Sequence, residues 1–196
     1  MAEPVATLFA QSALPAGGRV LADTLHLQVL PPRTVIVLKL GARSQKSAGD
    51  IRIAGRPLPL AVNTWSGDDP VLCRLGPDAW MLLSAQHGAA ELVDAVILGC
   101  KRRSFAATDV SDAWVTFALE GPQATEVLAR GCGLDFSEPV FGHGACTRTR
   151  FAQLPVLLRR ISHERFELMV DRSAASWLHE WLQDAAGLVV ADQARP

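Results

Sequence analysis

The chain has 196 residues, a length that fits one large domain or two small ones. Its 19 basic and 20 acidic side chains give a net charge of −1, so the overall charge does not favour nucleic acid or an anionic membrane as a partner. Apolar residues make up 49% and charged residues only 20%, which excludes a disordered chain and suggests that another polypeptide covers part of the surface.

The sequence predicts a cytoplasmic protein. The most apolar run, residues 92–100, is short and carries Asp94, whereas a membrane-spanning helix needs about 20 apolar residues. The N-terminus lacks the basic stretch of a signal peptide. Four cysteines are present, and none is part of the C-x-x-C pair of a zinc ribbon or redox motif: Cys73, Cys100, Cys132 and Cys146. We expect reduced, buried thiols.

In the first half of the chain, strand patterns surround two helix patterns. Residues 25–30 alternate apolar and polar side chains and predict an edge strand, which ends at Pro31-Pro32. Residues 34–40 are β-branched or apolar on both faces and predict a central strand. The remaining expected elements are a weak helix over 42–54, a loop over 56–70, strands over 71–75 and 79–84, a helix over 88–101 and a strand over 105–110.

The pattern then starts again. A strand is expected over 113–119, followed by a helix that opens at Gly121-Pro122 and ends at Gly131. Residues 146–161 predict a hairpin that turns near Ala152-Gln153. The last expected elements are a strand over 165–170, a helix over 173–186 capped by Asp171 or Ser173 and ended by Gly187, and a closing strand over 188–191.

The two halves resemble each other in sequence. Residues 34–44 resemble 114–124 at an offset of 80, and residues 78–96 resemble 164–182 at an offset of 86. Both halves follow the order β-α-β-β-α-β, so the sequence predicts an α+β fold of two tandem ferredoxin-like units. The expected organisation is an N-terminal extension over 1–32, one compact domain over 33–191 made of the pseudo-repeats 33–110 and 113–191, and a tail over 192–196.

Motifs of catalysis or nucleotide binding are absent from the sequence. It contains no G-x-S-x-G elbow, no G-x-x-x-x-G-K-[ST] phosphate loop and no G-x-G-x-x-G after a strand. His143 and Cys146 have the spacing of two zinc ligands, but no second pair stands nearby. We therefore expect no catalytic residue, no bound cofactor and no metal on this chain.

Two polar clusters allow a structural and a chemical reading. His163 and Glu164 fall at a turn between strands, where they are either solvated or form an acid–base pair. The cluster Asp109, Ser111 and Asp112 lies between two strands, where short polar side chains usually bond their own backbone and shape the turn.

Three tryptophans are candidates for a partner interface. Trp177 and Trp181 lie on the last helix, where they either join the apolar stripe or anchor another chain. Trp65 lies in the expected loop over 56–70, and the periodicity assigns it to no core face. It is therefore the strongest of the three candidates.

Two segments resemble the glycine cleavage T-protein superfamily, the aminomethyltransferase-like proteins. The segment TDVSDAWVTFALEGPQATEVLARGCGLDF, residues 108–136, carries a D-V-S motif, a strand, a G-P turn and a helix at the spacing of that family. RTRFAQLPVLLRRISHERFELMVDRSAASWLHEWL, residues 148–182, is similar to the R-x-x-x-x-x-x-P-V-L-x-x-R region and the helix after it. The resemblance implies tandem ferredoxin-like units, as in the folate-binding domain of that family.

The sequence also departs from the family pattern. The S-Y-T-G-E-x-G-Y-E insertion of folate-binding members is missing, because Ile161-Ser162 passes directly to His163-Glu164. The K-G-C-Y-x-G-Q signature of the iron–sulfur-assembly branch and the C-terminal barrel of the family are absent as well. With these losses, the chain is similar to the family of gamma subunits of heterotetrameric sarcosine oxidases.

That resemblance implies a complex that oxidises the N-methyl group of sarcosine, giving glycine and hydrogen peroxide and passing the one-carbon unit to tetrahydrofolate. It places FAD, FMN, NAD, tetrahydrofolate and zinc on partner subunits. It makes the gamma chain a non-catalytic scaffold that contacts mainly the alpha subunit, beside the beta and delta subunits. Catalytic, cofactor-binding and metal-ligating residues are not carried over to this chain.

Two alternatives remain open. One is the equivalent subunit of a related N-methyl amino acid dehydrogenase, which the sequence does not separate from the first hypothesis. The other is a stand-alone folate-binding or aminomethyl-transferring protein, which would need a carboxylate that reaches the pterin ring. Four carboxylates lie near the family motifs: Asp109, Glu120, Glu164 and Glu167.

Overall fold

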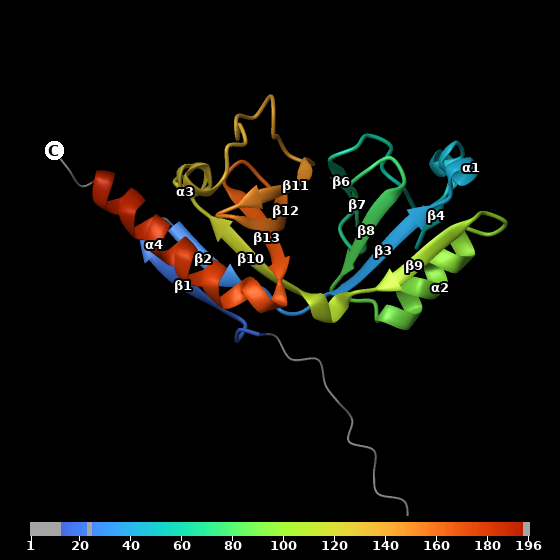
Figure 1. Ribbon diagram of the computed structural model, residues 1–196, viewed down its shortest axis with the longest axis horizontal. Coiled ribbons are helices and arrows are strands. Elements are labelled where there is room, and N and C mark those ends of the chain that lie inside the picture. The colour runs from blue at the N-terminus through green and yellow to red at the C-terminus, as the bar shows by residue number, and fades with distance from the viewer. Residues whose placement is uncertain (1–12, 23–24, 194–196) are drawn as a thin grey trace, which may run out of the picture.

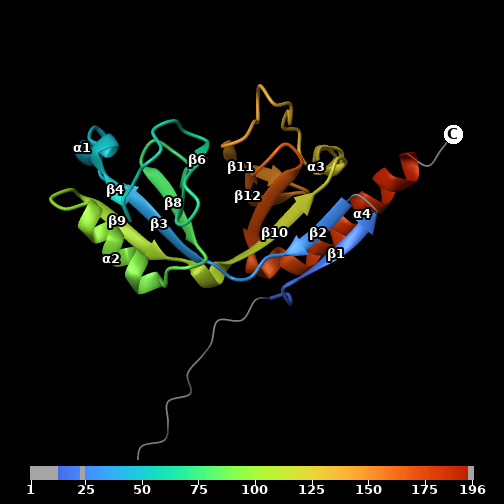
Figure 2. The same cartoon turned by 180° about the vertical axis from the view of Figure 1, so that it is seen from behind.

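The computed structural model describes residues 13–22 and 25–193, which form two antiparallel sheets arranged side by side. The sheets diverge from a central junction near residues 110–113, so that the molecule has the outline of an open V (Figure 1). The view from behind shows a helix against the outer side of each sheet (Figure 2). Within the described residues, no helix is long and apolar enough to span a membrane.

The first sheet has the strand order β6-β7-β8-β3-β9. Its strands are β3 (Thr34–Leu40), β6 (Thr64–Ser66), β7 (Val71–Arg74), β8 (Ala79–Ser84) and β9 (Phe105–Asp109). Helix α2 (Ala89–Gly99) covers it, and the short helix α1 (Ala42–Gln45) and the two-stranded sheet of β4 (Arg52–Ile53) and β5 (Arg56–Pro57) lie at its end.

The second sheet has the order β1-β2-β10-β13-β12-β11. Its strands are β1 (Gly17–Ala22), β2 (Leu25–Val29), β10 (Trp114–Glu120), β11 (Cys146–Phe151), β12 (Leu154–Arg160) and β13 (Arg165–Asp171). Helices α3 (Ala124–Gly131) and α4 (Ala175–Gln193) pack against it.

The predicted α+β class with two ferredoxin-like units is confirmed. The order β6-β7-β8-β3-β9 in the first sheet corresponds to β11-β12-β13-β10-β2 in the second, and all neighbouring strands are antiparallel in both. The central strands β3 and β10 hold equivalent positions. The hairpin turn predicted at Ala152-Gln153 is also confirmed, since both residues have positive φ, 46° and 71°, as a two-residue type I′ turn requires.

The closing strand expected over 188–191 is wrong, because α4 continues past Gly187 to Gln193. The place beside β10 is already filled by β2, with Val29 opposite Phe117 and His26 opposite Glu120. Of the apolar residues of the expected strand, Val189 extends the helical stripe and is fully buried in the core that includes Leu182, whereas Leu188 is 57% exposed. A strand over 188–191 therefore has no free position beside β10 on which to pair.

The N-terminal extension expected over 1–32 is wrong for the residues that the structure describes. β1 and β2 belong to the second sheet, and β2 lies between β1 and β10 rather than at the edge. Leu25, Leu27 and Val29 alternate inward and are buried beneath the helices. The chain thus supplies the last strand of its second unit from a segment that precedes the first unit. Residues 1–12, 23–24 and 194–196, which include part of the expected extension and tail, lie outside the described residues.

Two further expectations need correction in the first half. The weak helix over 42–54 breaks into α1, a 3₁₀ turn over Ala48–Asp50 and β4. The loop over 56–70 contains β5 and β6, so Trp65 lies on a strand. Because both strands are only two or three residues long, their patterns are too short to be read from periodicity.

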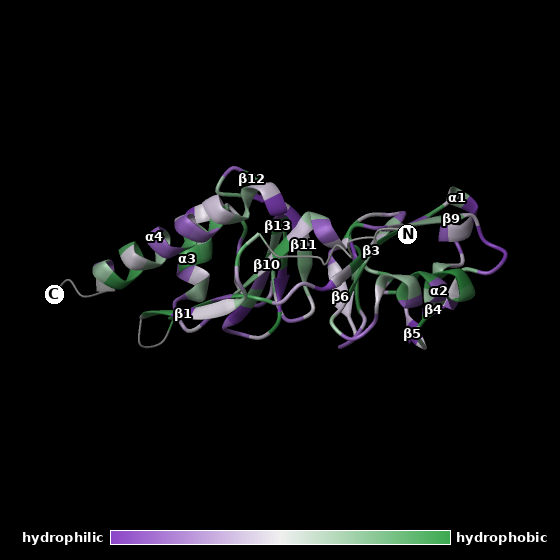
Figure 3. Cartoon of the chain, turned by 90° about the horizontal axis from the view of Figure 1, so that it is seen from below, coloured by the Kyte–Doolittle hydropathy of each residue, from purple (hydrophilic) through white to green (hydrophobic). Residues whose placement is uncertain are grey.

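Three apolar clusters form the core. One lies between the second sheet and α3 with α4, and another lies between the first sheet and α2. In Figure 3 polar and apolar residues alternate around α4, as expected for a helix that buries one face against a sheet. The third cluster joins the helix-free faces of the two sheets; it includes Cys73, Met81, Leu157 and Met169. The two units are therefore packed together by their own side chains.

The role of β2 can be tested by truncating one buried side chain. Leu27 is 1% exposed in the core of the second sheet, and Leu27→Ala should lower the free energy of unfolding by about 2–5 kcal/mol because it leaves a cavity. Val20 on β1 is 61% exposed, and Val20→Ala should change the free energy by less than about 0.5 kcal/mol. Urea unfolding measures both. Equal, small effects would contradict the placement of β2 in the core.

Candidate functional site

A buried cluster of charged residues lies where the two sheets meet. Arg33, in the linker between β2 and β3, donates two hydrogen bonds to the carboxylate of Glu167 on β13, at 2.8 and 3.1 Å. Arg159 on β12 donates a third, from Nη2 to Oε2, at 2.5 Å. Arg159 and Glu167 meet because the register of the β12–β13 hairpin places them directly opposite each other.

The environment of Glu167 keeps its carboxylate ionised. Burial alone would raise the pKa, but the charges and hydrogen bonds of Arg159 and Arg33 outweigh it and hold the pKa below the ordinary value of 4.5. Both carboxylate oxygens already accept hydrogen bonds from guanidinium groups. Glu167 is therefore held as a structural anion and is not free to exchange protons near neutral pH.

Trp65 on β6 packs against this cluster. Its indole N–H donates to the carbonyl oxygen of Arg160 at 3.1 Å, and the guanidinium carbon of Arg159 lies 5.0 Å from the ring centroid. Its ring also meets His143 edge-on at 5.4 Å. The main chain continues the contact, because Trp65 N–H donates to the carbonyl of Gly144 at 2.8 Å. Trp65 thus connects β6 to the second half of the same chain, a contact that the periodicity did not reveal, and its place at a partner interface stays a prediction.

A cavity of about 280 Å³ opens beside this cluster. Arg33, Trp65, Asp69, Arg159 and Glu167 are among the residues that line it. Nε and Nη1 of Arg159 are buried and have no hydrogen-bond partner within the described residues. The wall thus combines an aromatic face with charges of both signs.

Two buried thiols share the environment of Arg159. Cys73 on β7 and Cys146 on β11 belong to the same apolar cluster between the sheets. The neighbouring Cys146 thiol and the charge of Arg159 lower the pKa of Cys73. The neighbouring Cys73 and burial raise the pKa of Cys146, against the opposing effect of Arg159. All four cysteines lie in the described residues, are buried and are free.

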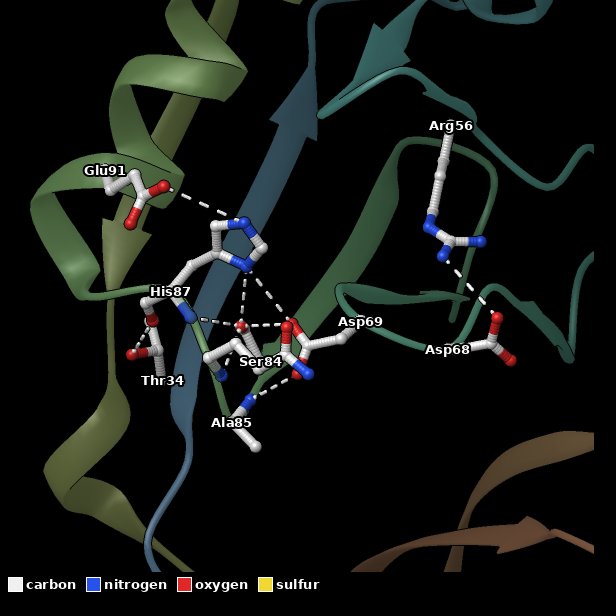
Figure 4. A network of polar contacts seen from close by, with 9 residues as sticks. Thr34, Arg56, Asp68, Asp69, Ser84, Ala85, His87 and Glu91 are labelled. Carbon is white, nitrogen blue, oxygen red and sulfur yellow. Dashed lines mark hydrogen bonds and ion pairs between the residues drawn. The ribbon is translucent and has the colours of Figure 1, made fainter.

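A polar network around Asp69 borders the cavity from the first sheet (Figure 4). The Asp69 carboxylate accepts from the Ser84 hydroxyl and, at 2.8 Å, from the N–H of Ala85. Burial would raise the pKa of Asp69, but these hydrogen bonds, with smaller contributions from His87 and Gln86, lower it.

The same network does not form a nucleophilic triad. Ser84 Oγ lies 3.1 Å and Asp69 Oδ1 lies 3.2 Å from the same ring nitrogen, Nδ1 of His87, while Nε2 faces Glu91 at 3.7 Å. A catalytic serine and its orienting acid must engage opposite nitrogens of the base. Ser84 Oγ instead accepts the N–H of His87 at 2.8 Å, so the network fixes the turn after β8.

The two polar clusters singled out in the sequence, His163 with Glu164 and Asp109 with Ser111, lie at turns. The side chain of His163 is 80% exposed, and Glu164 is exposed beside it at the turn. Asp109 accepts from the N–H and hydroxyl of Ser111, whose Oγ accepts the N–H of Val35 at 2.9 Å, so this cluster shapes a turn.

The remaining candidates are also apart from one another. Glu120 pairs with Arg165 at 2.9 Å, away from Glu167 in the charged cluster. His143 Nδ1 lies 2.7 Å from the carbonyl of Ile161, while Cys146 is buried among apolar side chains. Within the part of the chain that the structure describes, no three His, Cys, Asp or Glu residues are grouped to hold a metal ion.

The two tryptophans of α4 have different environments. Trp181 is partly buried and meets Phe151 edge-on at a centroid distance of 5.1 Å. Trp177 is 48% exposed on the outer side of the helix. The expected apolar stripe therefore includes Trp181 but not Trp177.

The sequence analysis missed the Arg33–Glu167–Arg159 cluster, although one signal was present. Once the strands 154–160 and 165–171 are paired around the turn at 162–164, Arg159 falls opposite Glu167. Arg33 carries no comparable signal, because it lies 134 positions from Glu167.

Residues 63–189 match the family model described as the GCVT N-terminal domain. Two curated relatives are sarcosine oxidase gamma subunits. That of Corynebacterium sp. (strain U-96) is 30% identical over 133 residues, which are 67% of this chain and 64% of that protein. That of Corynebacterium sp. (strain P-1) is 25% identical over 166 residues, 84% of this chain and 81% of that protein. The chain thus matches somewhat less than two thirds of the length of the first relative.

Solved structures give the same picture. A chain of the heterotetrameric sarcosine oxidase from Corynebacterium sp. U-96, in complex with pyrrole 2-carboxylate, superposes with a TM-score of 0.72 and 25% identity, over 84% of this chain and 85% of that one. Aminomethyltransferase T of the glycine cleavage system from Bartonella henselae superposes with a TM-score of 0.59 and 18% identity, over 81% of this chain and 45% of that one. The second likeness shows the shared fold.

The charged cluster predicts a specific response to acid. Because the pKa of folded Glu167 lies below the unfolded value of 4.5, its stabilising contribution is complete above that value and is lost as the pH falls below it. Glu167→Gln should lower the free energy of unfolding by on the order of 3 kcal/mol at neutral pH, and should flatten the decline in stability below about pH 4.5. Unfolding in urea across this range measures both effects, with the exposed Glu164→Gln as the matched control. The same acid dependence in wild type and Glu167→Gln would exclude this role.

Replacing Trp65 tests whether it joins the two sheets. Trp65→Ala removes a half-buried ring and its hydrogen bond, and should lower the free energy of unfolding by on the order of 2 kcal/mol. Trp177→Ala removes an exposed ring and should change it by less than about 1 kcal/mol. Thermal and urea unfolding of the isolated variants give both values. If Trp65→Ala is as stable as wild type, the contact does not hold the sheets together.

Proposed function

Because this chain belongs to the family of the GCVT N-terminal domain, we propose that it is the gamma subunit of a heterotetrameric sarcosine oxidase. The observation that carries the proposal is the superposition on a chain of such an enzyme, which covers 84% of this chain and 85% of that chain. The two curated gamma subunits add sequence support over 67% and 84% of this chain.

In this proposal the complex oxidises the N-methyl group of sarcosine, yields glycine and hydrogen peroxide, and transfers the one-carbon unit to tetrahydrofolate. The chain itself acts as a non-catalytic scaffold. Its polar groups support this role, since Glu167 is neutralised by two arginines and Ser84, His87 and Asp69 serve to fix a turn.

The proposal also assigns partners and location. The alpha subunit is the main contact, with beta and delta in the same cytoplasmic complex. FAD, FMN, NAD, tetrahydrofolate and zinc reside on those subunits. The low share of charged residues, 20%, is consistent with a surface that another chain covers.

Purification through this chain tests the proposal. A tag on the chain in its native host should recover three further subunits, a flavin absorption spectrum and sarcosine-dependent formation of hydrogen peroxide. Recovery of the chain without partners would contradict the proposal. Sarcosine oxidation that reduces a dye but forms no peroxide would instead favour the related dehydrogenase.

The isolated chain provides a second arm of the same test. We expect it to show no visible flavin spectrum and no saturable binding of tetrahydrofolate at micromolar concentration. Saturable binding that Glu167→Gln abolishes would favour a folate-binding protein instead.

A further inference from the structure

The outer edge of strand β11 is only partly covered. β11 is the last strand of the second sheet. At its start Cys146 N–H donates to the carbonyl of Asn63 at 2.9 Å, and at its end Ala152 N–H donates to the carbonyl of Gly131 at 2.8 Å. Residues 147–150 lie between these contacts, and within the described residues no strand pairs with their outer side.

The main chain of this segment presents hydrogen-bonding groups outward. Arg160 N–H donates inward to Ala145, whereas Cys146 N–H points away from β12 toward Asn63. Successive residues of an antiparallel strand alternate between the two directions. The N–H and C=O groups of Arg148 and Arg150 therefore face outward, in the position from which an added strand would be bound.

The side chains beside this edge line a cavity of about 540 Å³. Arg148 and Arg150 are exposed and contribute to its wall with Trp114 and Pro155. Arg150 bonds only to Gln153 at the adjacent turn, and Arg148 forms no side-chain hydrogen bond or ion pair within the described residues.

One further charged group lines this cavity. The carboxylate of Asp171 accepts from the N–H and hydroxyl of Ser173, which lowers its pKa. Two arginines against one aspartate leave the cavity with a net positive charge.

We propose that the outer edge of β11 binds an extended, acidic segment of the large partner subunit, which adds a strand to the second sheet. This inference rests on the proposed function. Main-chain bonds to Arg148 and Arg150 would hold the segment, and its carboxylates would accept from the two guanidinium groups.

The surroundings of the edge support a protein partner. Asn63 covers the start of the β11 edge through its hydrogen bond from Cys146. Leu60 and Val62, which precede Asn63 in the chain, are 57% and 44% exposed. Exposed apolar side chains therefore adjoin the residue at which the covered part of the edge ends. Charged side chains alone would also protect an open edge from aggregation. That explanation does not account for the cavity beside the edge.

Charge reversal on the assembled complex tests the proposal. The four subunits are co-expressed, and the affinity of the tagged chain for the other three is measured. Arg148→Glu with Arg150→Glu should weaken assembly about tenfold or more, with a smaller effect of salt on the variant than on wild type. The matched control reverses Arg43 of α1 and Lys46, the residue after that helix, which are exposed at the far end of the first sheet. We expect that control to assemble as wild type does.

A second pair of variants separates main chain from side chain. Arg148→Ala removes the guanidinium group and its stem but keeps the main-chain N–H, whereas Arg148→Pro also removes the outward N–H without taking a donor from the β11–β12 ladder. Assembly should be weaker for the proline variant than for the alanine variant, at equal melting temperature of the isolated chains. Equal assembly of the two folded variants would overturn the added strand.

The outcomes separate this inference from the proposed function. If wild type assembles and the Arg148/Arg150 reversal assembles equally well, the edge is not the binding surface and the proposed function stands. If wild type recruits no subunit, both fail. If wild type binds a single-stranded oligonucleotide and the same reversal abolishes that binding, the surface serves nucleic acid and the proposed partner is wrong.

Discussion

Glu167 lies between Arg33 and Arg159, and the relation between the two sheets depends on this buried cluster. Arg33 lies on the linker that leads from the second sheet to the first, whereas Arg159 and Glu167 belong to the second sheet itself. Trp65 of the first sheet covers Arg159 from the other side. Removing one member would leave a buried charge without its partner, which costs far more than an exposed ion pair contributes. The angle between the sheets is therefore fixed by charge pairing as well as by apolar packing.

The path of the chain reinforces this connection. Along the chain, β2 belongs to the second sheet and the next strand, β3, belongs to the first. β10 lies in the second sheet again, where it pairs with β2. The first unit is formed by the continuous segment 34–109, whereas the second unit combines 17–29 with 114–193, although both have the same strand order. The two pseudo-repeats are thus linked by the chain segments that join β2 to β3 and β9 to β10, by the apolar cluster around Met81 and Met169, and by the charged cluster.

Local patterns predicted the elements whose partners are near in sequence. The strands β3 and β10, helix α2 and the turn at Ala152-Gln153 followed from periodicity and turn chemistry. The position of β2 did not, because an alternating strand does not reveal with which distant strand it pairs. The end of α4 was predicted wrongly for the same reason. The pattern of residues 188–191 fits a strand or a helix, and the pairing of β2 with β10, which excludes the strand, cannot be read from that pattern.

The candidate site was less predictable than the fold. Trp65 could not be assigned to a core face, because the surface that it contacts is formed by Arg159 and His143 in the other half of the chain. Family resemblance pointed to the correct relatives, but it did not reveal the cluster around Glu167. A cluster of this kind depends on the register of a hairpin and on one distant arginine, and single-sequence patterns contain only the first.

Together these features describe a chain whose two sheets are held as one unit and whose free β11 edge is the proposed binding surface for a partner. Amide hydrogen exchange of the chain, measured free and within the purified complex, tests this claim most directly. The account predicts slow exchange of β10, β12 and β13 in both states, with new protection of the Arg148 and Arg150 amides in the complex. Fast exchange of those three strands in the free chain, with protection appearing only on assembly, would contradict it.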